Sequence, residues 1–379
     1  MSDTTLILLG AGSSSRFDTD VKKQWLYSGD RPLWLQVAAQ FETHYSFDRM
    51  IIVSSAEDIT IMKYFADYIY VEGGNTRQAS LRNALREVET PYVLVSDIAR
   101  ACVPAGMLTR ILDAKEEADC VVPALPVNDT LYLDESPIPR EKARIIQTPQ
   151  LSVTDKLREA LESDRIFTDD SSAIAAIGGT IHFVEGDSRA HKLTTLDDLA
   201  KLPCLKAPSS RTLVGYGIDI HPFEAGKAMV LCGVPIVSDY GFAAHSDGDV
   251  AIHALIDALL GAAGMGDIGE LYPDTDTAYA GADSKTLLHD TVRKLRSHGY
   301  EIGNVDLSIL AQIPKISPYK LHMRQTLASI LDIPMHRVNI KATTAEKLGF
   351  VGRKEGVTVH AVATLTYFDW KTLTEEQIS

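Results

Sequence analysis

The chain contains 379 residues, of which 45% are apolar and 23% are charged, a composition typical of globular proteins. At about 100–200 residues per domain, this length predicts two domains, each able to bury its own core. The net charge is −14 and no basic stripe is visible, which argues against a nucleic-acid-binding protein. The N-terminus lacks a basic n-region, and no apolar run is long enough to span a membrane. We therefore expect a cytoplasmic protein that binds neither nucleic acid nor a membrane.

The four cysteines are Cys102, Cys120, Cys204 and Cys232, and none of them forms a C-x-x-C pair. This scattered pattern fits a reducing compartment. It predicts neither a disulfide framework nor a zinc ribbon.

The first 200 residues alternate between strand-like and helix-like segments. Short β-rich runs occupy residues 5–9, 50–55, 92–96 and 120–125, and helical patterns lie between them at 33–45, 76–88 and 107–118. Nearly continuous apolar strands separated by helices predict a Rossmann-like α/β domain whose mostly parallel sheet is covered on both faces. Ligands of such sheets bind at the carboxyl ends of the strands. The segments GAGSSSR and SDIAR, each of which follows a strand, should therefore border one cleft.

A linker is expected at residues 201–211, where the sequence reads KLPCLKAPSSR and has no hydrophobic periodicity. It would separate a first domain at 1–210 from a second domain at 211–379. The second half is predicted to contain strands at 212–221, 303–312, 338–343 and 356–367, and helices at about 249–261, 283–298 and 318–331.

The segment GAGSSSRF at residues 10–17 is a candidate phosphate-binding loop. Its small residues, Gly12 among them, allow backbone N–H groups to approach an anion closely. The segment is not a P-loop, and it matches only two glycines of the dinucleotide fingerprint. A turn of small residues without any ligand is the alternative interpretation.

Charged residues near this loop favour a nucleotide. Arg16 ends the loop and Lys23 follows soon after it. Attack on a nucleotide α-phosphate builds negative charge, which fixed cations stabilise. Asp97 in SDIAR is a candidate ligand for a metal ion or a ribose, although each of these charges alone fits a solvated surface position equally well.

The order of these segments resembles that of the 2-C-methyl-D-erythritol 4-phosphate cytidylyltransferases. The matching pieces are GAGSSSR, KKQWL, GGNTRQAS, VLVSDIAR, PVNDT, QTPQ, TDDSSA and HKLTTLDDL, which span most of residues 5–200. The resemblance implies transfer of CMP from CTP to methylerythritol phosphate, with release of pyrophosphate.

The resemblance also implies roles for individual residues. Arg16 and Lys23 would stabilise the transition state, and Asp97 would lie near Mg²⁺ or Mn²⁺. Arg140 and Lys192 would position methylerythritol phosphate, with the arm that carries Arg140 contributed by a dimer partner. The other implied substrate contacts are Gly12, Ser80, Thr130 and Thr148.

Three departures from the family pattern affect the expected nucleotide site. Ser14 stands where the family usually has glycine, Lys22 replaces a proline, and SDIAR replaces HDAAR. A positive φ at Ser14 would cost of the order of 1–3 kcal/mol. We expect these changes to affect nucleotide affinity more than the type of reaction.

The second half contains a candidate metal site. Asp219 and His221 are two residues apart in a predicted strand and should therefore point to the same face. Ser246 and Asp249 read as a capping box that opens a helix, on which His253 lies at the edge of the apolar stripe. Two histidines and one carboxylate suit Zn²⁺ with an open fourth position, and the same set accepts iron or manganese.

The segments GIDIH, AHSDGDVAIHALIDALLGAAGMGDIG, LYPDTD, GNVDLSILAQIPKISP and KATTAEKLGFVGR resemble 2-C-methyl-D-erythritol 2,4-cyclodiphosphate synthase over residues 212–368. This resemblance implies an α+β fold with helices on one side of a sheet, and trimers with sites between subunits. The 2-phosphate of a cytidine diphosphate adduct would attack the β-phosphate and expel CMP.

In that mechanism the implied metal ligands are Asp219, His221 and His253. His245 and Thr344 would stabilise the transition state, while Glu346 would lie near a Mg²⁺ that bridges the phosphates. Residues 311–317 would hold the cytosine. The expected substrate contacts are Ser246, Asp267, Ile268, Gly269, Asp274, Asp276, Ala311, Pro314, Lys315, Thr343, Glu346, Phe350 and Arg353.

Together the two halves predict a bifunctional enzyme of isoprenoid precursor synthesis, in a homo-oligomer that is a trimer or a hexamer. Because its two steps are not consecutive, a separate kinase must phosphorylate the first product. The alternatives are a sugar-1-phosphate nucleotidyltransferase fused to a metal phosphohydrolase, and a metal- and nucleotide-binding regulator without activity. An NAD-dependent oxidoreductase fits least, because the third glycine of its fingerprint is missing.

Overall fold

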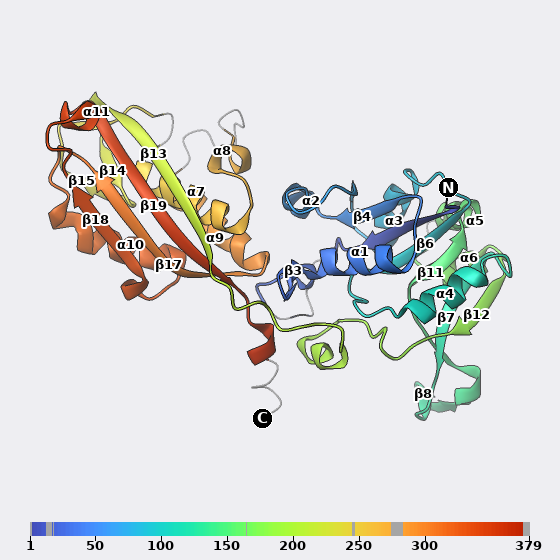
Figure 1. Ribbon diagram of the computed structural model, residues 1–379. Coiled ribbons are helices and arrows are strands. Elements are labelled where there is room, and N and C mark those ends of the chain that lie inside the picture. Colours follow the sequence, from blue (N-terminus) through green and yellow to red (C-terminus); the bar gives the residue numbers. More distant parts are fainter. Residues whose placement is uncertain are drawn as a thin grey trace. The chain divides into compact units, whose positions relative to one another are not determined.

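The computed structural model describes residues 2–12, 17, 19–163, 165–244, 247–273 and 283–373. Their contacts divide the chain into two compact units (Figure 1). Unit 1 contains the residues up to Pro208 together with the segment from Asp369 onward, and unit 2 runs from Ser209 to Phe368. None of the helices formed by the described residues is long and apolar enough to cross a bilayer.

Unit 1 is built on an eight-stranded mixed sheet with the order β10-β7-β11-β6-β1-β4-β5, in which β12 also pairs with β7. The strands of this unit are β1 (Thr4–Leu9), β2 (Tyr27–Ser28), β3 (Arg31–Pro32), β4 (Met50–Ser54), β5 (Ile69–Glu72), β6 (Tyr92–Asp97), β7 (Cys120–Pro126), β8 (Leu131–Leu133), β9 (Ser136–Ile138), β10 (Arg144–Ile146), β11 (Gln150–Val153) and β12 (Ile181–Glu185). The pairs β1–β4, β1–β6, β4–β5 and β7–β12 are parallel, although β5 and β12 were not predicted as strands. Strands β10 and β11 run antiparallel to their neighbours and were not foreseen.

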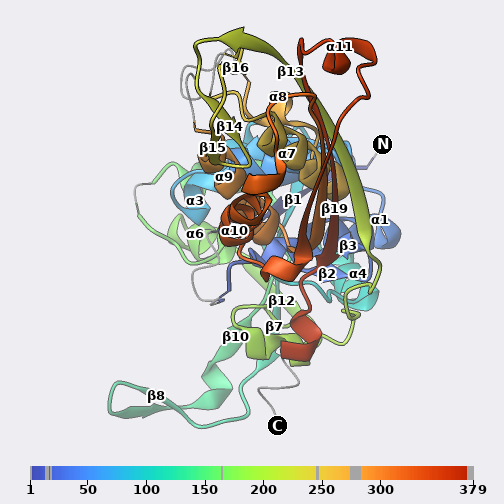
Figure 2. The same ribbon diagram turned by 90° about the vertical axis from the view of Figure 1, so that its left-hand side faces the viewer.

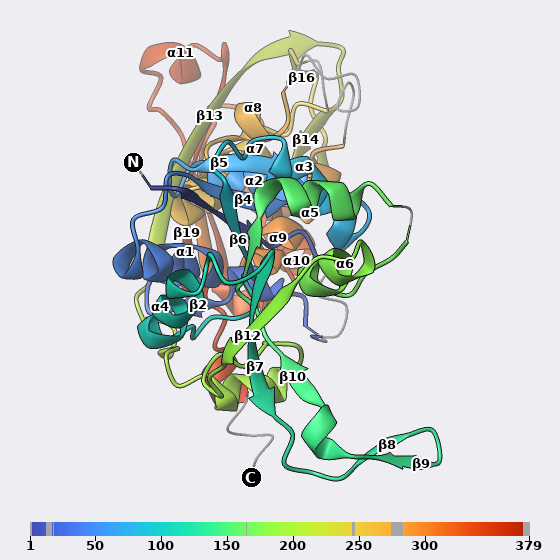
Figure 3. The same ribbon diagram turned by 90° about the vertical axis from the view of Figure 1, so that its right-hand side faces the viewer.

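Helices cover both faces of this sheet, which explains why strands such as β1 are buried at every position. Helices α3, α5 and α6 lie on one face and α1 and α4 on the other (Figure 3). The helices of unit 1 are α1 (Leu33–His44), α2 (Ala56–Met62), α3 (Arg77–Leu85), α4 (Ala105–Asp113), α5 (Thr154–Leu161) and α6 (Asp170–Ala176), with short 3-10 turns η1 (Lys23–Trp25), η2 (Arg140–Lys142) and η3 (Leu196–Lys201).

The predicted linker is largely part of unit 1. Lys206 donates its backbone N–H to Ser28 Oγ at 2.9 Å, and Gly29 forms a bridge with Pro208. Cys204 forms a disulfide with Cys102, with 5.6 Å between their Cα atoms. The expectation of unpaired cysteines is therefore wrong for this pair. The two residues are 102 positions apart, so only the folded chain brings them together.

Unit 2 contains a five-stranded sheet with the order β16-β13-β19-β17-β18 and helices α7, α9 and α10 on one side of it (Figure 2). Its strands are β13 (Leu213–Ala225), β14 (Met229–Leu231), β15 (Val234–Ile236), β16 (Tyr240–Phe242), β17 (Tyr300–Leu310), β18 (Val338–Thr343) and β19 (Gly356–Tyr367). Its helices are α7 (Val250–Ala263), α8 (Ile268–Leu271), α9 (Ser284–Ser297), α10 (Lys320–Leu331) and α11 (Gly349–Gly352), with 3-10 turns η4 (Ser317–Tyr319) and η5 (Met335–Arg337). The predicted strands and helices match β13, β17, β18, β19, α7, α9 and α10 within a few residues, whereas β14, β15, β16, α8 and α11 were not predicted.

Helix α7 begins differently from the prediction. Its N-cap is Asp249, whose carboxylate accepts the backbone N–H groups of Ala251 and Ile252 at 3.2 and 3.1 Å. The predicted capping box with Ser246 at its start is therefore wrong. Asp249 also accepts the N–H groups of Cys232 and Gly233, so this fully buried carboxylate holds the β14–β15 turn against the helix.

The C-terminal segment belongs to unit 1, whereas we expected the second domain to extend to residue 379. Trp370 is only 3% exposed, and its indole N–H donates to the carbonyl oxygen of Tyr27 at 2.7 Å. A segment that follows the last strand of unit 2 thus completes the core of unit 1.

We predict that Trp370→Ala destabilises unit 1 by about 3–5 kcal/mol, because it removes a buried indole and leaves a cavity. Urea unfolding followed by the fluorescence of Trp25 and Trp34, which both lie in unit 1, measures the change. Ile166→Ala is the control, since this side chain is 88% exposed. Equal midpoints for Trp370→Ala and the control would contradict the prediction.

Candidate active sites

A cavity of about 560 Å³ lies at the carboxyl ends of β1 and β6 in unit 1. Five of the predicted nucleotide-site residues line it, namely Gly12, Lys23, Ser80, Asp97 and Lys192. The expectation that the first loop and SDIAR border one cleft is confirmed. Arg16 and Ser14 lie outside the described residues.

The two glycines of GGNTRQAS allow close packing at this cavity. A Cβ on Gly73 would lie 2.4 Å from the Cβ of Ala11, so only glycine lets the two loops meet. Ser80 Oγ accepts the backbone N–H of Gly74 at 3.0 Å and thereby shapes the turn before α3. Thr76 caps this helix by accepting the N–H of Ala79 at 3.0 Å. The predicted glycine turn is thus part of the cavity wall.

Opposite charges alternate along one side of the cavity. Lys192 Nζ lies 2.7 Å from Asp97 Oδ2, Arg77 Nε lies 3.7 Å from Asp97 Oδ1, and Arg77 Nη1 lies 2.7 Å from Asp170 Oδ1. Burial alone would raise the pKa of Asp97, but the charges of Lys192 and Arg77 lower it below its ordinary value. Asp97, the last residue of β6, is therefore held ionised in the cavity wall.

Arg77 lines the cavity and was missed by the sequence analysis, as was its partner Asp170. Both stand inside the quoted segments GGNTRQAS and TDDSSA, yet they are 93 positions apart. Asp170 is fully buried, and Arg77 is the basic partner that compensates its charge. The sequence signal for this ion pair was weak: GGNTRQAS contains one basic residue, and TDDSSA contains two adjacent acids.

A buried carboxylate organises the turn that presents Lys23. Asp58 accepts hydrogen bonds from Lys22 Nζ at 2.7 Å, Gln24 Nε2 at 3.1 Å and Trp25 Nε1 at 3.1 Å. Because both neighbours of Lys23 are anchored in this way, its position on η1 is fixed from either side. Lys22, which departs from the family pattern, thus has a structural partner in this chain.

The other predicted residues of unit 1 lie near or outside this cavity. Thr148 Oγ1 accepts from Arg100 Nε at 2.8 Å, and Arg100 Nη1 donates to the carbonyl of Ala190 at 2.6 Å. Thr130 and Arg140 are exposed at the base of the β8–β9 hairpin, which extends away from the sheet (Figure 3). Arg140 contacts the carbonyl of Asn128 there. These two residues are not among those that line the cavity of their own unit.

A second cavity in unit 1, of about 630 Å³, lies at the amino ends of β4 and β5. Its lining includes Tyr45, Phe47, Asp48 and Tyr68. Ligands of open parallel sheets bind at the opposite edge, at the carboxyl ends. Position in the sheet therefore favours the smaller cavity as the ligand site.

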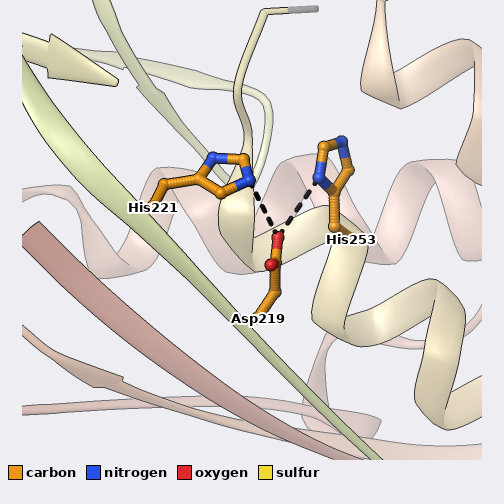
Figure 4. A group of neighbouring side chains, drawn as sticks. All are labelled: Asp219, His221 and His253. Carbon is orange, nitrogen blue, oxygen red and sulfur yellow. Dashed lines mark hydrogen bonds and ion pairs between the residues drawn. The ribbon is translucent and has the colours of Figure 1, made fainter. Parts of the chain in front are cut away.

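In unit 2 three side chains converge as the sequence predicted (Figure 4). Asp219 Oδ2 lies 3.2 Å from His221 Nε2 and 3.2 Å from His253 Nδ1. One ligand atom from each residue lies within 4.8 Å of the other two. One carboxylate and two imidazoles with this spacing fit a tetrahedral divalent cation with one position left open.

Strand β13 presents its ligands to α7 because of two glycines. A Cβ on Gly215 would lie 1.9 Å from the carbonyl oxygen of Ala258, and one on Gly217 would lie 2.0 Å from that of Ala254. The strand can therefore lie directly against the helix backbone. Side chains alternate along a strand, so Asp219 and His221 follow these glycines on the face that meets α7.

Partners outside the triad orient its members. His221 Nδ1 lies 3.0 Å from the carbonyl oxygen of Gly248, which can only accept, and the backbone N–H of Ile220 donates to Asp219 Oδ1 at 2.8 Å. Burial would raise the pKa of Asp219, but the contacts with His221 and His253 lower it well below its ordinary range. Burial alone would lower the pKa of His221, which the Asp219 carboxylate raises. An ionised carboxylate between two imidazoles offers the ligand types that a divalent cation needs.

A second group of predicted residues gathers at the ends of β17 and β18. Ala311 donates its N–H to the carbonyl of Thr343 at 3.0 Å, and Thr344 Oγ1 donates to Glu346 Oε1 at 2.6 Å. Pro314 follows a cis peptide bond in the same loop as Lys315. Phe350 lies on α11, and Arg353 just after it is paired with Glu355 at 2.8 Å.

This second group lies at the same end of the sheet as the triad but on different strands. His221 pairs with Val357 on β19, and Thr358 pairs with Leu310 on β17, beside Thr343 on β18. Three strand spacings therefore separate β13 from β18, which is about 14 Å. Within one chain the β18 end with Thr343 is thus well apart from the triad. Phe350 and Arg353, by contrast, directly precede β19, whose first residues pair with β13.

The remaining predicted contacts lie around α8. Asp267 caps this helix by accepting the N–H of Glu270 at 2.9 Å, and Ile268 donates its N–H to Asp257 Oδ1 on α7 at 2.9 Å. Gly269 follows them on α8. The predictions for His245, Ser246, Asp274 and Asp276 fall outside the described residues.

Comparison with known proteins separates the same two halves. Residues 4–204 match the family described as 2-C-methyl-D-erythritol 4-phosphate cytidylyltransferase, and residues 212–366 match the YgbB family. The bifunctional enzyme IspD/IspF of Sulfurovum sp. (strain NBC37-1) is 71% identical over 371 residues, which cover 98% of this chain and 100% of that protein. The bifunctional enzyme IspD/IspF of Sulfurimonas denitrificans is 57% identical over 97% of this chain and 95% of the relative.

A solved structure agrees over both units. The bifunctional IspDF from Campylobacter jejuni is similar with a TM-score of 0.85 at 47% identity, covering 97% of this chain and 100% of that one. Fold, sites and relatives define a bifunctional enzyme that joins a nucleotidyltransferase to a cyclodiphosphate synthase. The chain belongs to the bifunctional IspD/IspF family of the methylerythritol phosphate pathway. One activity transfers CMP from CTP to 2-C-methyl-D-erythritol 4-phosphate, and the other forms the 2,4-cyclodiphosphate with release of CMP.

We predict that Arg77→Met destabilises unit 1 by about 3–5 kcal/mol at pH 7, because it leaves the buried Asp170 without a compensating charge. A carboxylate whose pKa is lowered on folding stabilises the protein above its unfolded pKa, and this contribution disappears as the pH falls through the folded pKa. Burial raises the pKa of Asp170 and Arg77 opposes this rise, so the penalty for charging Asp170 in the variant disappears as the pH falls to the unfolded pKa of about 4. Since Arg77 also helps lower the pKa of Asp97, the difference from wild type should shrink further below that pH.

Urea unfolding monitored by tryptophan fluorescence at pH 7 and pH 3 measures this effect. All three tryptophans, Trp25, Trp34 and Trp370, lie in unit 1, so the signal reports on that unit. Arg189→Met is the control, because Arg189 forms an exposed pair with Asp187 and its loss should change stability little. A loss of stability in Arg77→Met that does not depend on pH would contradict the electrostatic explanation.

Proposed function

We propose that cytidylyl transfer takes place in the 560 Å³ cavity of unit 1. Lys23, together with Arg16, would stabilise the charge that develops on the α-phosphate of CTP. Lys192 would position methylerythritol phosphate, and Asp97 would hold Lys192 in place while lying near Mg²⁺ or Mn²⁺. The observation that carries this proposal is that Gly12, Lys23, Ser80, Asp97 and Lys192 come from separate segments and line the same cavity.

The structure supports specific contacts for the substrates of this reaction. The N-terminus of α3 and the Gly73–Gly74 turn offer backbone N–H groups beside Ser80, where we place the nucleotide. We assign Thr148 to the substrate site through Arg100, which holds its hydroxyl. Arg140 and Thr130 are carried on a projecting arm, and we propose that they complete the cavity of a dimer partner.

We propose that unit 2 holds a divalent cation, Zn²⁺ by preference, on Asp219, His221 and His253. Such an ion supplies Lewis-acid polarisation of a phosphoryl oxygen, worth several kcal/mol at the transition state. The chain itself would fold the substrate so that its 2-phosphate faces its β-phosphate, an intramolecular arrangement that lowers the entropic barrier. Thr344 and His245 would stabilise the charge that develops, and Glu346 would hold Mg²⁺ or Mn²⁺ between the phosphates.

The substrate contacts of unit 2 fall into two groups in this proposal. Asp267, Ile268 and Gly269 near α8, with Ser246, Asp274 and Asp276, would contact the methylerythritol part. The loop with Ala311, Pro314 and Lys315 would hold cytosine through backbone groups. The phosphate contacts would come from Thr343, Glu346, Phe350 and Arg353.

We propose that unit 2 forms a trimer in which each site is completed by a second copy. The separation of about 14 Å between the triad and the β18 end supports this, because a diphosphate bound at the triad would lie far from Thr343 of the same chain. An exposed apolar stripe lies on the face of β13 away from α7, formed by Val214, Tyr216, Ile218 and Ile220. Such a patch marks a protein interface. A hexamer would follow if the arm of unit 1 also forms a dimer contact.

The pathway implies one further partner. The product of unit 1 must be phosphorylated before unit 2 can use it, so we expect a separate kinase to act between the two sites.

Two variants test the assignment of the reactions to the units. Lys23→Ala should abolish pyrophosphate release from CTP and methylerythritol phosphate while leaving CMP release from the cyclase substrate intact. His253→Ala should do the reverse and should also lose bound zinc. Phosphorus NMR of the products and metal analysis measure both effects, with Lys201→Ala as an exposed control. Either variant losing both activities, or neither, would sink the assignment.

The trimer has its own test. Ile218→Asp places a carboxylate on the apolar stripe and should shift the assembly to smaller species in sedimentation velocity, because burying this charge is costly. CMP release should fall with the trimer, whereas pyrophosphate release should persist. A wild-type chain that sediments as a stable monomer at working concentration would refute the proposal.

A further inference from the structure

The imidazole of His253 has partners on both of its nitrogens. Nδ1 faces Asp219 Oδ2 at 3.2 Å, and Nε2 lies 3.0 Å from Ser284 Oγ. Ser284 is the first residue of α9 and is fully buried. A group on the first turn of one helix therefore contacts the proposed metal ligand on another helix, α7.

Ser284 is itself held by Asp247. Its hydroxyl donates to Asp247 Oδ1 through a short hydrogen bond, and its backbone N–H donates to Asp247 Oδ2 at 3.1 Å. A carboxylate offers only acceptors, so the single hydroxyl proton of Ser284 is directed to Asp247. Toward His253 the Ser284 oxygen can then only accept, which requires that Nε2 carries the ring proton.

This hydrogen-bond order determines which nitrogen faces the triad with a lone pair. With the proton on Nε2, the Nδ1 atom of neutral His253 is a free acceptor directed at the centre of the triad. His221 reaches the same state by another route, since its Nδ1 donates to the carbonyl of Gly248 and leaves Nε2 inward. A cation needs such an inward lone pair from each imidazole.

We propose that Asp247 and Ser284 are positioning residues for His253, which fix its ring orientation and its tautomer for metal binding. The inference rests on the proposed metal site of unit 2 and adds two residues to it. Asp247 is not the cap of α7, which is Asp249, although Asp247 Oδ1 also accepts the backbone N–H of Asp249 at 3.3 Å.

Helix capping does not account for the Ser284 hydroxyl. The N-cap of α9 is Asp283, whose side chain accepts the N–H of Lys285 at 2.9 Å. The hydroxyl of Ser284 is thus not needed to begin the helix. Its two contacts are with Asp247 and with the metal-ligand candidate His253.

Two substitutions separate tautomer control from simple packing. Ser284→Ala removes the acceptor for Nε2–H and frees the ring to turn. Asp247→Asn keeps the shape but reverses the hydrogen bonds: the amide oxygen must face the N–H of Ser284, so the amide NH₂ must donate to its hydroxyl oxygen. The hydroxyl proton then points at His253 Nε2, which favours the proton on Nδ1, against the cation.

The test measures zinc affinity of the full-length chain by competition with a chromophoric chelator. Loss of a group that orients a metal ligand typically weakens metal binding 10–100-fold, and we expect this range for both Ser284→Ala and Asp247→Asn. Ser297→Ala is the matched control on the same helix, since its hydroxyl donates to the carbonyl of Lys294 instead. The control should bind zinc like wild type, and Co²⁺ absorption spectra should change only in the two test variants.

Three outcomes are decisive. Wild-type zinc affinity in both test variants overturns the positioning role while leaving the metal site standing. Absence of zinc binding by the wild-type chain overturns the metal site and this inference together. Long-range ¹H–¹⁵N NMR of the zinc-loaded wild type needs no variant to fold: a proton on Nε2 of His253 supports the inference, and one on Nδ1 overturns it.

Discussion

The close contact between strand β13 and helix α7 is the constraint on which the cyclase unit depends. It exists because positions 215 and 217 carry no Cβ, so the helix backbone can occupy the space that side chains would fill. The same alternation that turns these glycines toward α7 turns Asp219 and His221 toward it as well. His253 meets them from the helix, and Asp249 fixes the start of that helix by accepting backbone N–H groups. A larger side chain at either glycine would move the strand and separate the ligands.

In unit 1, buried carboxylates hold the basic side chains of the cavity in place. Its cavity gathers lysines and arginines, which would repel one another without carboxylates between them. Asp97 and Asp170 supply those carboxylates, and Asp58 does the same for the turn that carries Lys23. Each carboxylate is buried beside basic groups. Asp58 has several donors, Asp97 has Lys192 and Arg77, and Asp170 has Arg77, so removing a basic partner leaves a charge less compensated. The carboxylates of this unit therefore determine the positions of its lysine and arginine side chains.

Local patterns in the sequence predicted much of this arrangement. The spacing of Asp219, His221 and His253 on one strand and one helix was sufficient to place the triad, because strand and helix periods are known. The order of the first-half strands likewise placed Gly12 and Asp97 at one edge. Contacts between distant segments were not predictable in this way, as the pair Arg77–Asp170 and the disulfide Cys102–Cys204 show. Nothing in the periodicity revealed that β10 and β11 enter the sheet antiparallel, or that Trp370 returns to unit 1.

The two units differ in where their positive charge comes from, and this difference follows from their substrates. In unit 1 the nucleophile and the leaving group are separate molecules, so lysines on rigid turns can be placed around each of them. In unit 2 two phosphates of a single substrate must approach one another, so positive charge must lie close to both. A lysine is long and mobile, whereas the cation that we propose on Asp219 and the two imidazoles would be compact and fixed. The surrounding residues must then fix the orientation of the two imidazoles. The hydroxyl of Ser284, itself held by the carboxylate of Asp247, would do this for His253.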